Sequence, residues 1–187
     1  MKQDNNTFIK IDPKKLDKNI FSMMDDDWML ITAGNRESFN CMTASWGTAG
    51  ILWNKPVAIC FIRPQRYTYG FIEKSDFYTL CFLSENERHI LDYCGSYSGR
   101  DTDKIKETGL KPLFTSNGAI YYEQARLVLE CRKLYSAPLE EDNFIVKKII
   151  PANYPSKDFH KFYIGEIVNC MERRDESGEQ EKMSRMS

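Results

Sequence analysis

Residues 40–46 read NCMTASW, a strand-like stretch that combines small hydroxyl side chains with an amide and a tryptophan. Side chains alternate along a strand, so the stretch presents two different faces. One face consists of Asn40, Met42, Ala44 and Trp46, and the other of Cys41, Thr43 and Ser45. Small residues let a flat ligand approach the backbone, and the amide and indole offer hydrogen bonds and an aromatic surface. These residues alone leave equally open a strand that packs against a helix.

A second motif, RPQRYT at 63–68, places two arginines around a proline directly after an apolar run. Pro64 keeps Arg63 extended, so the preceding strand is expected to end there. Arg66 and Thr68 then fall at a helix start, where free backbone N–H groups and the helix dipole favour an anion. Guanidinium groups hold phosphate oxygens in bidentate pairs. The motif predicts a phosphate site, although two surface arginines and an ordinary helix cap explain it as well.

A third stretch, CGSYSGRDTDK at 94–104, is a turn-rich loop that carries glycine, serine, aspartate and lysine. Its backbone amides are suited to surround an anion, and Lys104 adds a positive charge. A solvent-exposed loop between two helices is the alternative interpretation.

The composition describes one domain with balanced charge. The chain has 187 residues, 26 of them basic and 27 acidic, and a formal net charge of −1. That balance argues against a nucleic-acid partner, which would require a basic excess or stripe. The N-terminal residues lack the apolar region of a signal peptide, and no apolar run is long enough to span a bilayer. We therefore expect a soluble, cytoplasmic protein with no membrane partner.

Six cysteines and two histidines provide little basis for a metal site. The cysteines form no CxxC pair, and five of them lie in apolar, strand-like runs. Buried thiols behave as small hydrophobic groups, and a cytosolic protein keeps them reduced. We expect structural thiols and no metal. Only Cys94, in the loop-like third stretch, stays open to another role.

Strand patterns recur along the chain and outnumber helical ones, which predicts a mainly β barrel with short helical insertions. The expected strands cover 28–34, 39–47, 56–62, 77–83, 119–135 and 161–171. The expected helices cover about 69–74, 84–93 and 101–109, with Thr68, Ser84 and either Asp101 or Thr102 as caps. Gly95 is expected to stop the second helix. We expect one domain over 1–171, a disordered polar tail over 172–187, and fraying of the first seven residues.

Four motifs together resemble a known family. The order NxMTASW, RPxRYT, CGxxSGRDxDK and HxxYIGEI (160–167) is similar to that of the flavin reductase-like FMN-binding family, in particular its flavoredoxin branch. The resemblance runs from about residue 20 to residue 171. It implies a split β-barrel, usually a homodimer, that binds FMN without covalent attachment near the subunit interface.

The resemblance also implies which residues form the site. The strand beside the flavin ring would be Asn40, Met42, Thr43, Ala44, Ser45 and Trp46. The phosphate end would be Arg63, Arg66, Tyr67 and Thr68, and Cys94, Gly95, Ser98, Gly99, Asp101 and Lys104 would complete the pocket. His160 and Tyr163 match the late motif and would lie on the substrate side, with His160 as a candidate catalytic residue and Tyr163 as a candidate substrate contact.

Lys104 is the second candidate for a catalytic role. A reduced flavin carries negative charge near N1 and O2, and a nearby ammonium group favours that charge. The Lys104→Met substitution is therefore expected to change the midpoint potential of bound FMN.

Three functions follow from the resemblance. The first is a flavin reductase that takes hydride from NADH or NADPH and passes electrons to free flavin or another acceptor. The second is an electron carrier that docks to redox proteins and has no NAD(P)H activity of its own. The third, a flavin-free interaction domain, is disfavoured by the intact Arg63, Arg66, Thr68 and Lys104 set. The 11 Phe, 10 Tyr and 3 Trp residues favour a homodimer with a shared apolar surface.

Overall fold

The computed structural model describes residues 7–174 of the chain. The expected fraying covers residues 1–7, of which 1–6 lie outside the described residues, while the Thr7 carbonyl accepts a hydrogen bond from the Arg174 N–H (2.9 Å). Most of the expected tail, residues 175–187, also lies outside the described residues. The last strand continues to Arg173, so Glu172 and Arg173 belong to the sheet rather than to a tail. They pair with Ile9 and Phe8 of the first strand, which the sequence reading missed.

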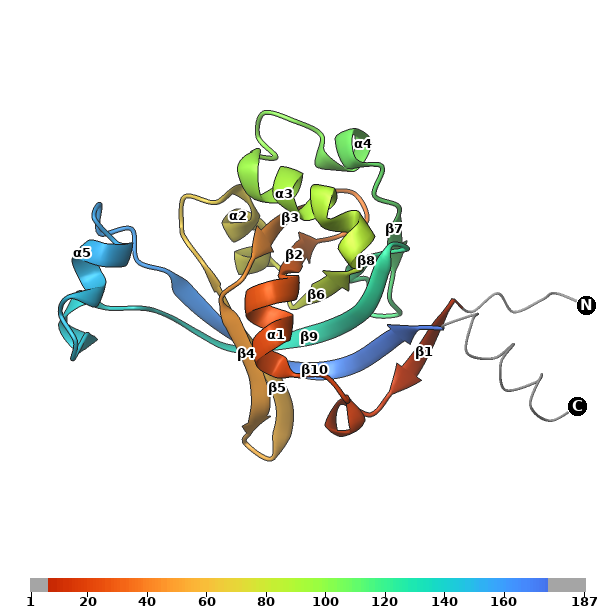
Figure 1. Ribbon diagram of the computed structural model, residues 1–187, viewed down its shortest axis with the longest axis horizontal. Helices are drawn as coiled ribbons and strands as arrows, with labels where there is room; N and C mark the ends of the chain where they lie inside the picture. The colour runs from red at the N-terminus through yellow and green to blue at the C-terminus, as the bar shows by residue number, and fades with distance from the viewer. Residues whose placement is uncertain (1–6, 175–187) are drawn as a thin grey trace, which may run out of the picture.

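One antiparallel sheet forms the body of the protein (Figure 1). Its strands lie side by side in the order β3-β2-β6-β9-β10-β5-β4, and β1 pairs with the end of β10. The bounds are β1 Phe8–Ile11, β2 Met29–Gly34, β3 Phe39–Ala44, β4 Gly47–Leu52, β5 Lys55–Ile62, β6 Phe77–Leu83, β9 Ala125–Pro138 and β10 Lys161–Arg173. A small separate pair consists of β7 Pro112–Phe114 and β8 Ile120–Tyr122. The predicted mainly β fold is confirmed.

The long strands β9 and β10 curve the sheet around its core. Their pairing shifts register between Ile164 and Gly165 and again between Ile167 and Asn169. Such irregularities bend and twist a strand, which lets β10 pair with β5 along its first half and with β1 at its end.

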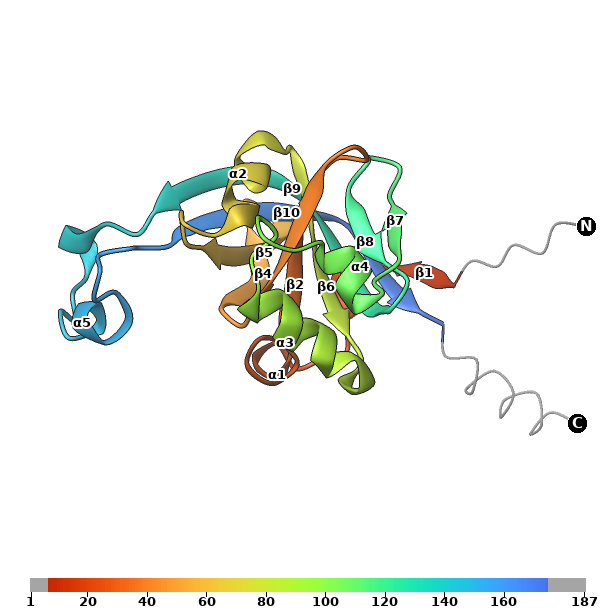
Figure 2. The ribbon, with the colours of Figure 1, turned by 90° about the horizontal axis from the view of Figure 1, so that it is seen from above.

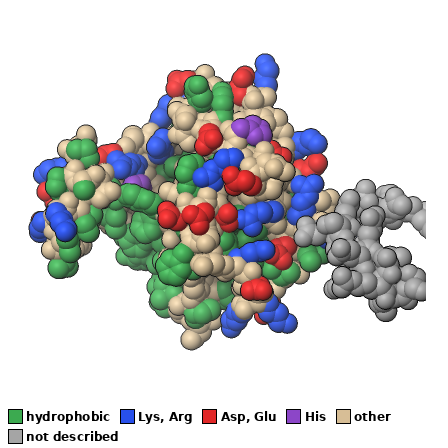
Figure 3. Space-filling view, viewed as in Figure 1, with side chains coloured by type: hydrophobic (Ala, Val, Ile, Leu, Met, Phe, Trp, Pro, Cys, Tyr) green, Lys and Arg blue, Asp and Glu red, His purple; other side chains and the backbone are tan. Residues whose placement is uncertain are grey.

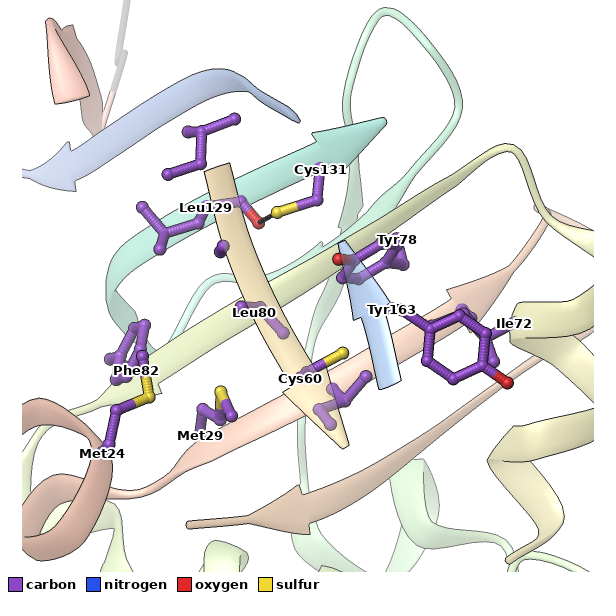
Figure 4. Close-up of a cluster of buried hydrophobic side chains, with 14 of the residues drawn as sticks. Met24, Met29, Cys60, Ile72, Tyr78, Leu80, Phe82, Leu129, Cys131 and Tyr163 are labelled. Atoms are coloured by element: carbon purple, nitrogen blue, oxygen red, sulfur yellow. Dashed lines mark hydrogen bonds between the residues drawn. The ribbon is translucent and has the colours of Figure 1, made fainter. Parts of the chain in front are cut away.

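The core inside the curved sheet is built from aromatic, aliphatic and sulfur-containing side chains (Figure 4). Tyr78, Leu80 and Phe82 come from β6 and are fully buried. All six cysteines are buried and free, as expected for structural thiols. In the described part of the chain, no group of His, Cys, Asp or Glu residues is arranged to hold a metal ion. No helix within residues 7–174 is long and apolar enough to cross a membrane.

Short helices pack on both faces of the sheet, and one helix stands away from it (Figures 1 and 2). The α-helices are α1 Ile20–Ser22, α2 Tyr67–Lys74, α3 Arg88–Ser96, α4 Lys104–Thr108 and α5 Ile149–Asn153. Single turns of other helix types are η1 Pro13–Lys15, η2 Met23–Asp27, η3 Glu85–Glu87 and η4 Glu141–Asn143. The helix α5 belongs to residues 139–160, here called the arm, which link β9 to β10. A hydrogen bond from the Leu139 N–H to the His160 carbonyl (2.8 Å) closes the base of the arm.

Four expectations about the helix ends were wrong. Ser84 makes no side-chain cap, and α3 continues to Ser96 with Gly95 inside it, because Leu91 and Cys94 are buried on its inner face. The cap of α4 is Asp103, whose carboxylate accepts hydrogen bonds from two backbone N–H groups of the first turn. Thr68 lies within α2 rather than at its cap. Gly109 ends α4 with a φ of 69°, a conformation that glycine adopts without strain.

Some strand boundaries also differed from the expectation. The run 39–47 divides into β3 and the start of β4, and the run 119–135 divides into β8 and β9. Besides β1, the sequence reading missed β7 and most of β4. The β4 run is rich in glycine, alanine and threonine and lacks the aromatic residues that mark most of the other strands.

Gly165 provides a test of the packing between β10 and its neighbours. A Cβ atom at this position would lie 2.7 Å from Cys131 Cβ and 2.5 Å from Tyr78 Oη, both fully buried. We expect Gly165→Ala to destabilise the protein by about 1–3 kcal/mol, because the added methyl group overpacks the core. Thermal unfolding should show a Tm lower by about 3–10 °C.

The matched control is Gly50→Ala on β4, where a Cβ atom meets nothing within 4 Å. A Gly165→Ala protein that unfolds at the wild-type temperature would show that the core accommodates the methyl group.

Candidate functional site

The strand β3 lies between α2 and α3 and contacts both helices (Figure 1). On the α2 side, Asn40 Nδ2 donates a hydrogen bond to Thr68 Oγ1 (2.7 Å). On the α3 side, Thr43 Oγ1 donates to the Leu91 carbonyl, and a Cβ on Gly95 would touch Thr43 at 3.4 Å. The alternation predicted for NCMTASW is therefore present, with one face toward each helix. The small side chains of β3 pack against these helices. This is the second interpretation of the stretch, a strand that packs against a helix.

Two adjoining cavities open beside the end of β3. The first, here called the aromatic cavity, has a volume of about 470 Å³. The second, the loop cavity, has a volume of about 340 Å³ and is closed by the loop after α3. They share the lining residues Met42, Arg63, Arg66 and Ser96. An elongated ligand can therefore extend from one cavity into the other.

The aromatic cavity contains a histidine held by its neighbours. The Tyr154 hydroxyl lies 2.9 Å from His160 Nδ1. The ring centroids of Trp46 and Phe61 lie 5.0 Å and 6.4 Å from that of the imidazole. Burial lowers the pKa of His160 from its ordinary 6.5 to about 4, and the nearby positive charge of Arg63 acts in the same direction. The imidazole is therefore neutral at neutral pH.

Arg63 anchors the arm. Its Nη1 pairs with Asp158, and its Nη2 donates a hydrogen bond to the Asn153 carbonyl (2.9 Å). The hydrogen bond from Arg63 lowers the pKa of Asp158. Gln65 also donates to Asp158 (2.6 Å). Arg63 thus lines both cavities while most of its hydrogen-bonding capacity is directed toward the arm.

Arg66 occupies a different position. It is the N-cap of α2, its side chain lines both cavities, and it forms no ion pair with any described residue. The Arg66 side chain makes no cap hydrogen bond, so it does not satisfy the first-turn N–H groups of α2. An arginine and a helix N-terminus at one cavity wall favour an anionic group.

The loop after α3 approaches β3 closely. A Cβ on Gly99 would lie 2.0 Å from Asn40 Oδ1, so only glycine fits this approach. The Arg100 guanidinium lies over the Tyr67 ring at 5.1 Å and donates to the Gln65 carbonyl (3.1 Å). These contacts fix the loop against the start of α2.

Lys104 is buried behind β3, with 5% of its surface exposed. Its Nζ donates hydrogen bonds to the Cys41 carbonyl (2.9 Å) and the Cys94 carbonyl (2.7 Å). Burial lowers the pKa of Lys104, and the charge of Arg66 adds to this effect. The side chain reaches the loop cavity but not the aromatic cavity. The two sulfur atoms of Cys41 and Cys94 lie 3.8 Å apart beside it.

Most of the predicted site residues come together at these cavities. The aromatic cavity includes Met42, Thr43, Ala44, Ser45, Trp46, Arg63, Arg66, Gly95 and His160. The loop cavity includes Asn40, Met42, Arg63, Arg66, Tyr67, Thr68, Cys94, Ser98, Gly99 and Lys104. Asp101 lines neither and faces an adjacent hollow that also includes Lys104.

Tyr163 lies apart from both cavities. It is fully buried, and its hydroxyl donates to Glu73 Oε1 (2.8 Å) at the end of α2, near Ile72 (Figure 4). That hydrogen bond and burial raise the pKa of Tyr163. The structure therefore gives this tyrosine a place in the core.

Several lining residues were missed from the sequence. They are Trp28, Phe61, Gln65, Leu91, Asp92, Ser96, Tyr97 and Arg100. Phe61 precedes Arg63 by two positions, and residues two apart on a strand share a face. The alternation along β5 could therefore have predicted that Phe61 lines the same cavity as Arg63. Ser96, Tyr97 and Arg100 lie inside or beside a motif that was recognised. Trp28 stands alone before β2, under the Arg88 guanidinium at 3.8 Å, and nothing in its neighbourhood in the sequence indicated a cavity.

Comparison with known proteins shows the family. The model of the flavin reductase like domain matches residues 22–184, and the chain belongs to this family. The eight-stranded sheet with short helices is accordingly its split β-barrel. Membership supports a redox function that involves a flavin. No curated protein sequence matches the chain.

Three solved structures share the fold. Flavoredoxin of Desulfovibrio vulgaris (Miyazaki F) has 22% identity and a TM-score of 0.62, over 89% of this chain and 78% of that one. An FMN-binding protein of Thermus thermophilus has 22% identity and a TM-score of 0.60, over 76% and 68%. An NADH:FAD oxidoreductase of Streptomyces globisporus has 14% identity and a TM-score of 0.58, over 79% and 74%.

The lowered pKa of His160 gives a testable pH dependence. Since its folded pKa of about 4 lies below the ordinary 6.5, the unfolded chain binds the proton more readily. The stability associated with a neutral His160 is present above pH 6.5 and is lost as the pH falls to about 4. The difference in unfolding free energy between wild type and His160→Gln should therefore shrink over this range, as measured by urea unfolding.

His89→Gln is the control, because that imidazole is exposed on α3. A wild-type minus His160→Gln difference that stays constant between pH 7 and pH 4 would contradict the assigned burial of His160.

Proposed function

We propose that the chain binds FMN without covalent attachment, with the ring in the aromatic cavity and the phosphate at the loop cavity. The observation that carries this proposal is the pair of adjoining cavities, one lined by aromatic side chains and the other by cationic groups and a helix N-terminus. Their shared wall at Met42 and Arg66 matches a ligand with a planar end and an anionic end. FMN has this shape, and the family is that of the flavin reductases.

The phosphate end is supported by the start of α2. Arg66 lacks an ion-pair partner among residues 7–174 and extends along both cavities. Thr68 holds Asn40, and Gly99 keeps the loop close to that amide. Ser98 completes this wall. In this proposal Arg63 contributes charge, while its hydrogen bonds stay with the arm.

The ring end is supported by Trp46 and by the short side chains of Thr43, Ala44 and Ser45. They leave room beside the backbone and supply one large aromatic surface. A bound flavin would provide the hydride and electron chemistry, and the chain's residues would position it and limit water. His160 stays a candidate catalytic residue on this side.

Lys104 stays a candidate for stabilising reduced flavin through its positive charge. Its two backbone contacts place the ammonium group behind β3, toward the loop cavity. We propose that it acts on a flavin across the strand, in a buried setting where charges interact over longer distances than in water.

The Arg66→Met substitution tests the phosphate site. It removes a charged donor from the wall where the phosphate would lie, so the Kd for FMN should rise about 10- to 100-fold. The Kd for riboflavin, which has no phosphate, should change little. Quenching of flavin fluorescence measures both affinities.

Arg36→Met is the matched control, because Arg36 stacks on Phe114 and lines neither cavity. Equal losses for FMN and riboflavin in Arg66→Met would place the phosphate elsewhere.

For the reaction, we propose an NAD(P)H-dependent reduction of flavin or of another acceptor. The similar Streptomyces globisporus protein is an NADH:FAD oxidoreductase. Trp46, with 45% of its surface exposed, lies at the open side of the aromatic cavity, where a nicotinamide would enter. The second candidate is an electron carrier without its own NAD(P)H activity, which the similarity to flavoredoxin favours.

Anaerobic absorbance spectroscopy separates these functions. The FMN-loaded protein is mixed with NADH and, in a second experiment, with NADPH. Rapid bleaching of the bound flavin by either nucleotide is expected and identifies the donor. A flavin that stays oxidised until dithionite is added would contradict the reductase and support the electron carrier.

We further propose that the protein is a cytoplasmic homodimer. Apolar side chains gather on the arm and on the adjoining part of the barrel (Figure 3). Ile145 has 92% of its surface exposed, and Val146 and Ile149 are also exposed on the arm. Trp53, at the turn between β4 and β5, is exposed as well. Such surfaces commonly mark protein interfaces, and a second copy of the chain is the partner we propose.

A further inference from the structure

The inference concerns Tyr154, a residue of the arm that none of the four sequence motifs contains. Its side chain has 3% of its surface exposed and packs against Phe144 and Phe159, with ring centroids 5.9 Å and 5.0 Å away. Its hydroxyl lies 2.9 Å from His160 Nδ1. Because the Tyr154 ring is buried and packed, its hydroxyl is held in one position beside His160 Nδ1.

The chemistry of the two groups decides which atom donates. A phenol O–H is a good donor and its oxygen a poor acceptor, while an unprotonated imidazole nitrogen is a good acceptor. Burial also raises the pKa of Tyr154, so its proton stays on the oxygen. The Tyr154 hydroxyl therefore donates to Nδ1, and the single proton of the neutral imidazole lies on Nε2.

Nε2 is the imidazole nitrogen that Tyr154 leaves free for a ligand in the cavity. His160 lines the aromatic cavity, and within residues 7–174 Nε2 has no hydrogen-bonding partner. Trp46 and Phe61 beside the imidazole are apolar on their faces and do not compete for the Nε2 proton. Burial lowers the pKa of His160, the positive charges of Arg63 and Arg66 act in the same direction, and Asp158 opposes them.

We propose that Tyr154 is a positioning residue that holds His160 with its proton on Nε2, so that the aromatic cavity presents a hydrogen-bond donor to a carbonyl oxygen of the substrate. The carboxamide oxygen of a nicotinamide is the acceptor that fits the proposed function, on which this part of the inference rests. The tautomer itself depends only on the residues of this chain.

Nitrogen-15 NMR of the imidazole tests the tautomer without any flavin. The chain has two histidines, so the His89→Gln variant leaves His160 as the only imidazole signal. Near neutral pH, the spectrum should show a protonated Nε2 and an unprotonated Nδ1. Tyr154→Phe should give a mixture of the two tautomers, because the donor to Nδ1 is lost while the aromatic ring stays.

Tyr121→Phe on β8 is the matched control, since Tyr121 lines neither cavity, and it should leave the tautomer unchanged. A wild-type His160 protonated on Nδ1 would overturn the proposal, as would a Tyr154→Phe spectrum identical to that of wild type. The wild-type spectrum alone is decisive if Tyr154→Phe does not fold.

Ligand binding to the FMN-loaded protein tests the donor. We expect Tyr154→Phe to raise the Kd of NAD⁺ about 3- to 10-fold, the effect of one neutral hydrogen bond. The thionicotinamide analogue, whose sulfur is a weak acceptor, should show little change. In His160→Gln, the amide nitrogen supplies a donor near the Nε2 position, so adding Tyr154→Phe should have no further effect.

Equal losses for NAD⁺ and its thio analogue would overturn the assignment of the donor. A protein that fails to bind FMN contradicts the proposed function instead, and the NMR result still decides the tautomer.

Discussion

The buried ammonium group of Lys104 is the interaction on which the candidate site depends. A charge removed from water must find partners within the protein, and Lys104 finds the carbonyls of Cys41 on β3 and Cys94 on α3. It joins α4, which carries it, to the strand and helix that wall the cavities. On the other side of β3, the bond from Asn40 to Thr68 ties the strand to α2. The helices α2, α3 and α4, which supply part of the cavity walls, are thus positioned by contacts to a single strand.

The arm adds a second set of contacts from a different part of the chain. Arg63 holds Asp158 and the Asn153 carbonyl, and Tyr154 meets His160. The arm therefore contributes His160 to the aromatic cavity, and the hydrogen bonds from Arg63 hold the arm against the cavity wall. One surface of the arm carries these polar contacts, and its exposed apolar side chains remain available for a partner (Figure 3).

The sequence predicted the features that depend on local patterns. Alternation along 40–46 predicted the two faces of β3, and Pro64 marked the end of β5 before α2. Local patterns did not predict the contacts between segments that are distant in the sequence. Nothing near Lys104 in the sequence shows that its ammonium group meets two backbone carbonyls, and nothing near Tyr154 points to His160. Gly95 was expected to end α3, but the helix continues past it to Ser96, with Leu91 and Cys94 buried on its inner face.

A crystal structure of the protein with FMN would show directly whether the two cavities hold the cofactor. We expect the flavin ring in the aromatic cavity beside Trp46 and His160, with the phosphate at Arg66 and the first turn of α2. We also expect Arg63 to keep its contacts with the arm. A flavin bound outside the two cavities, or with its phosphate away from Arg66, would contradict the proposed FMN site.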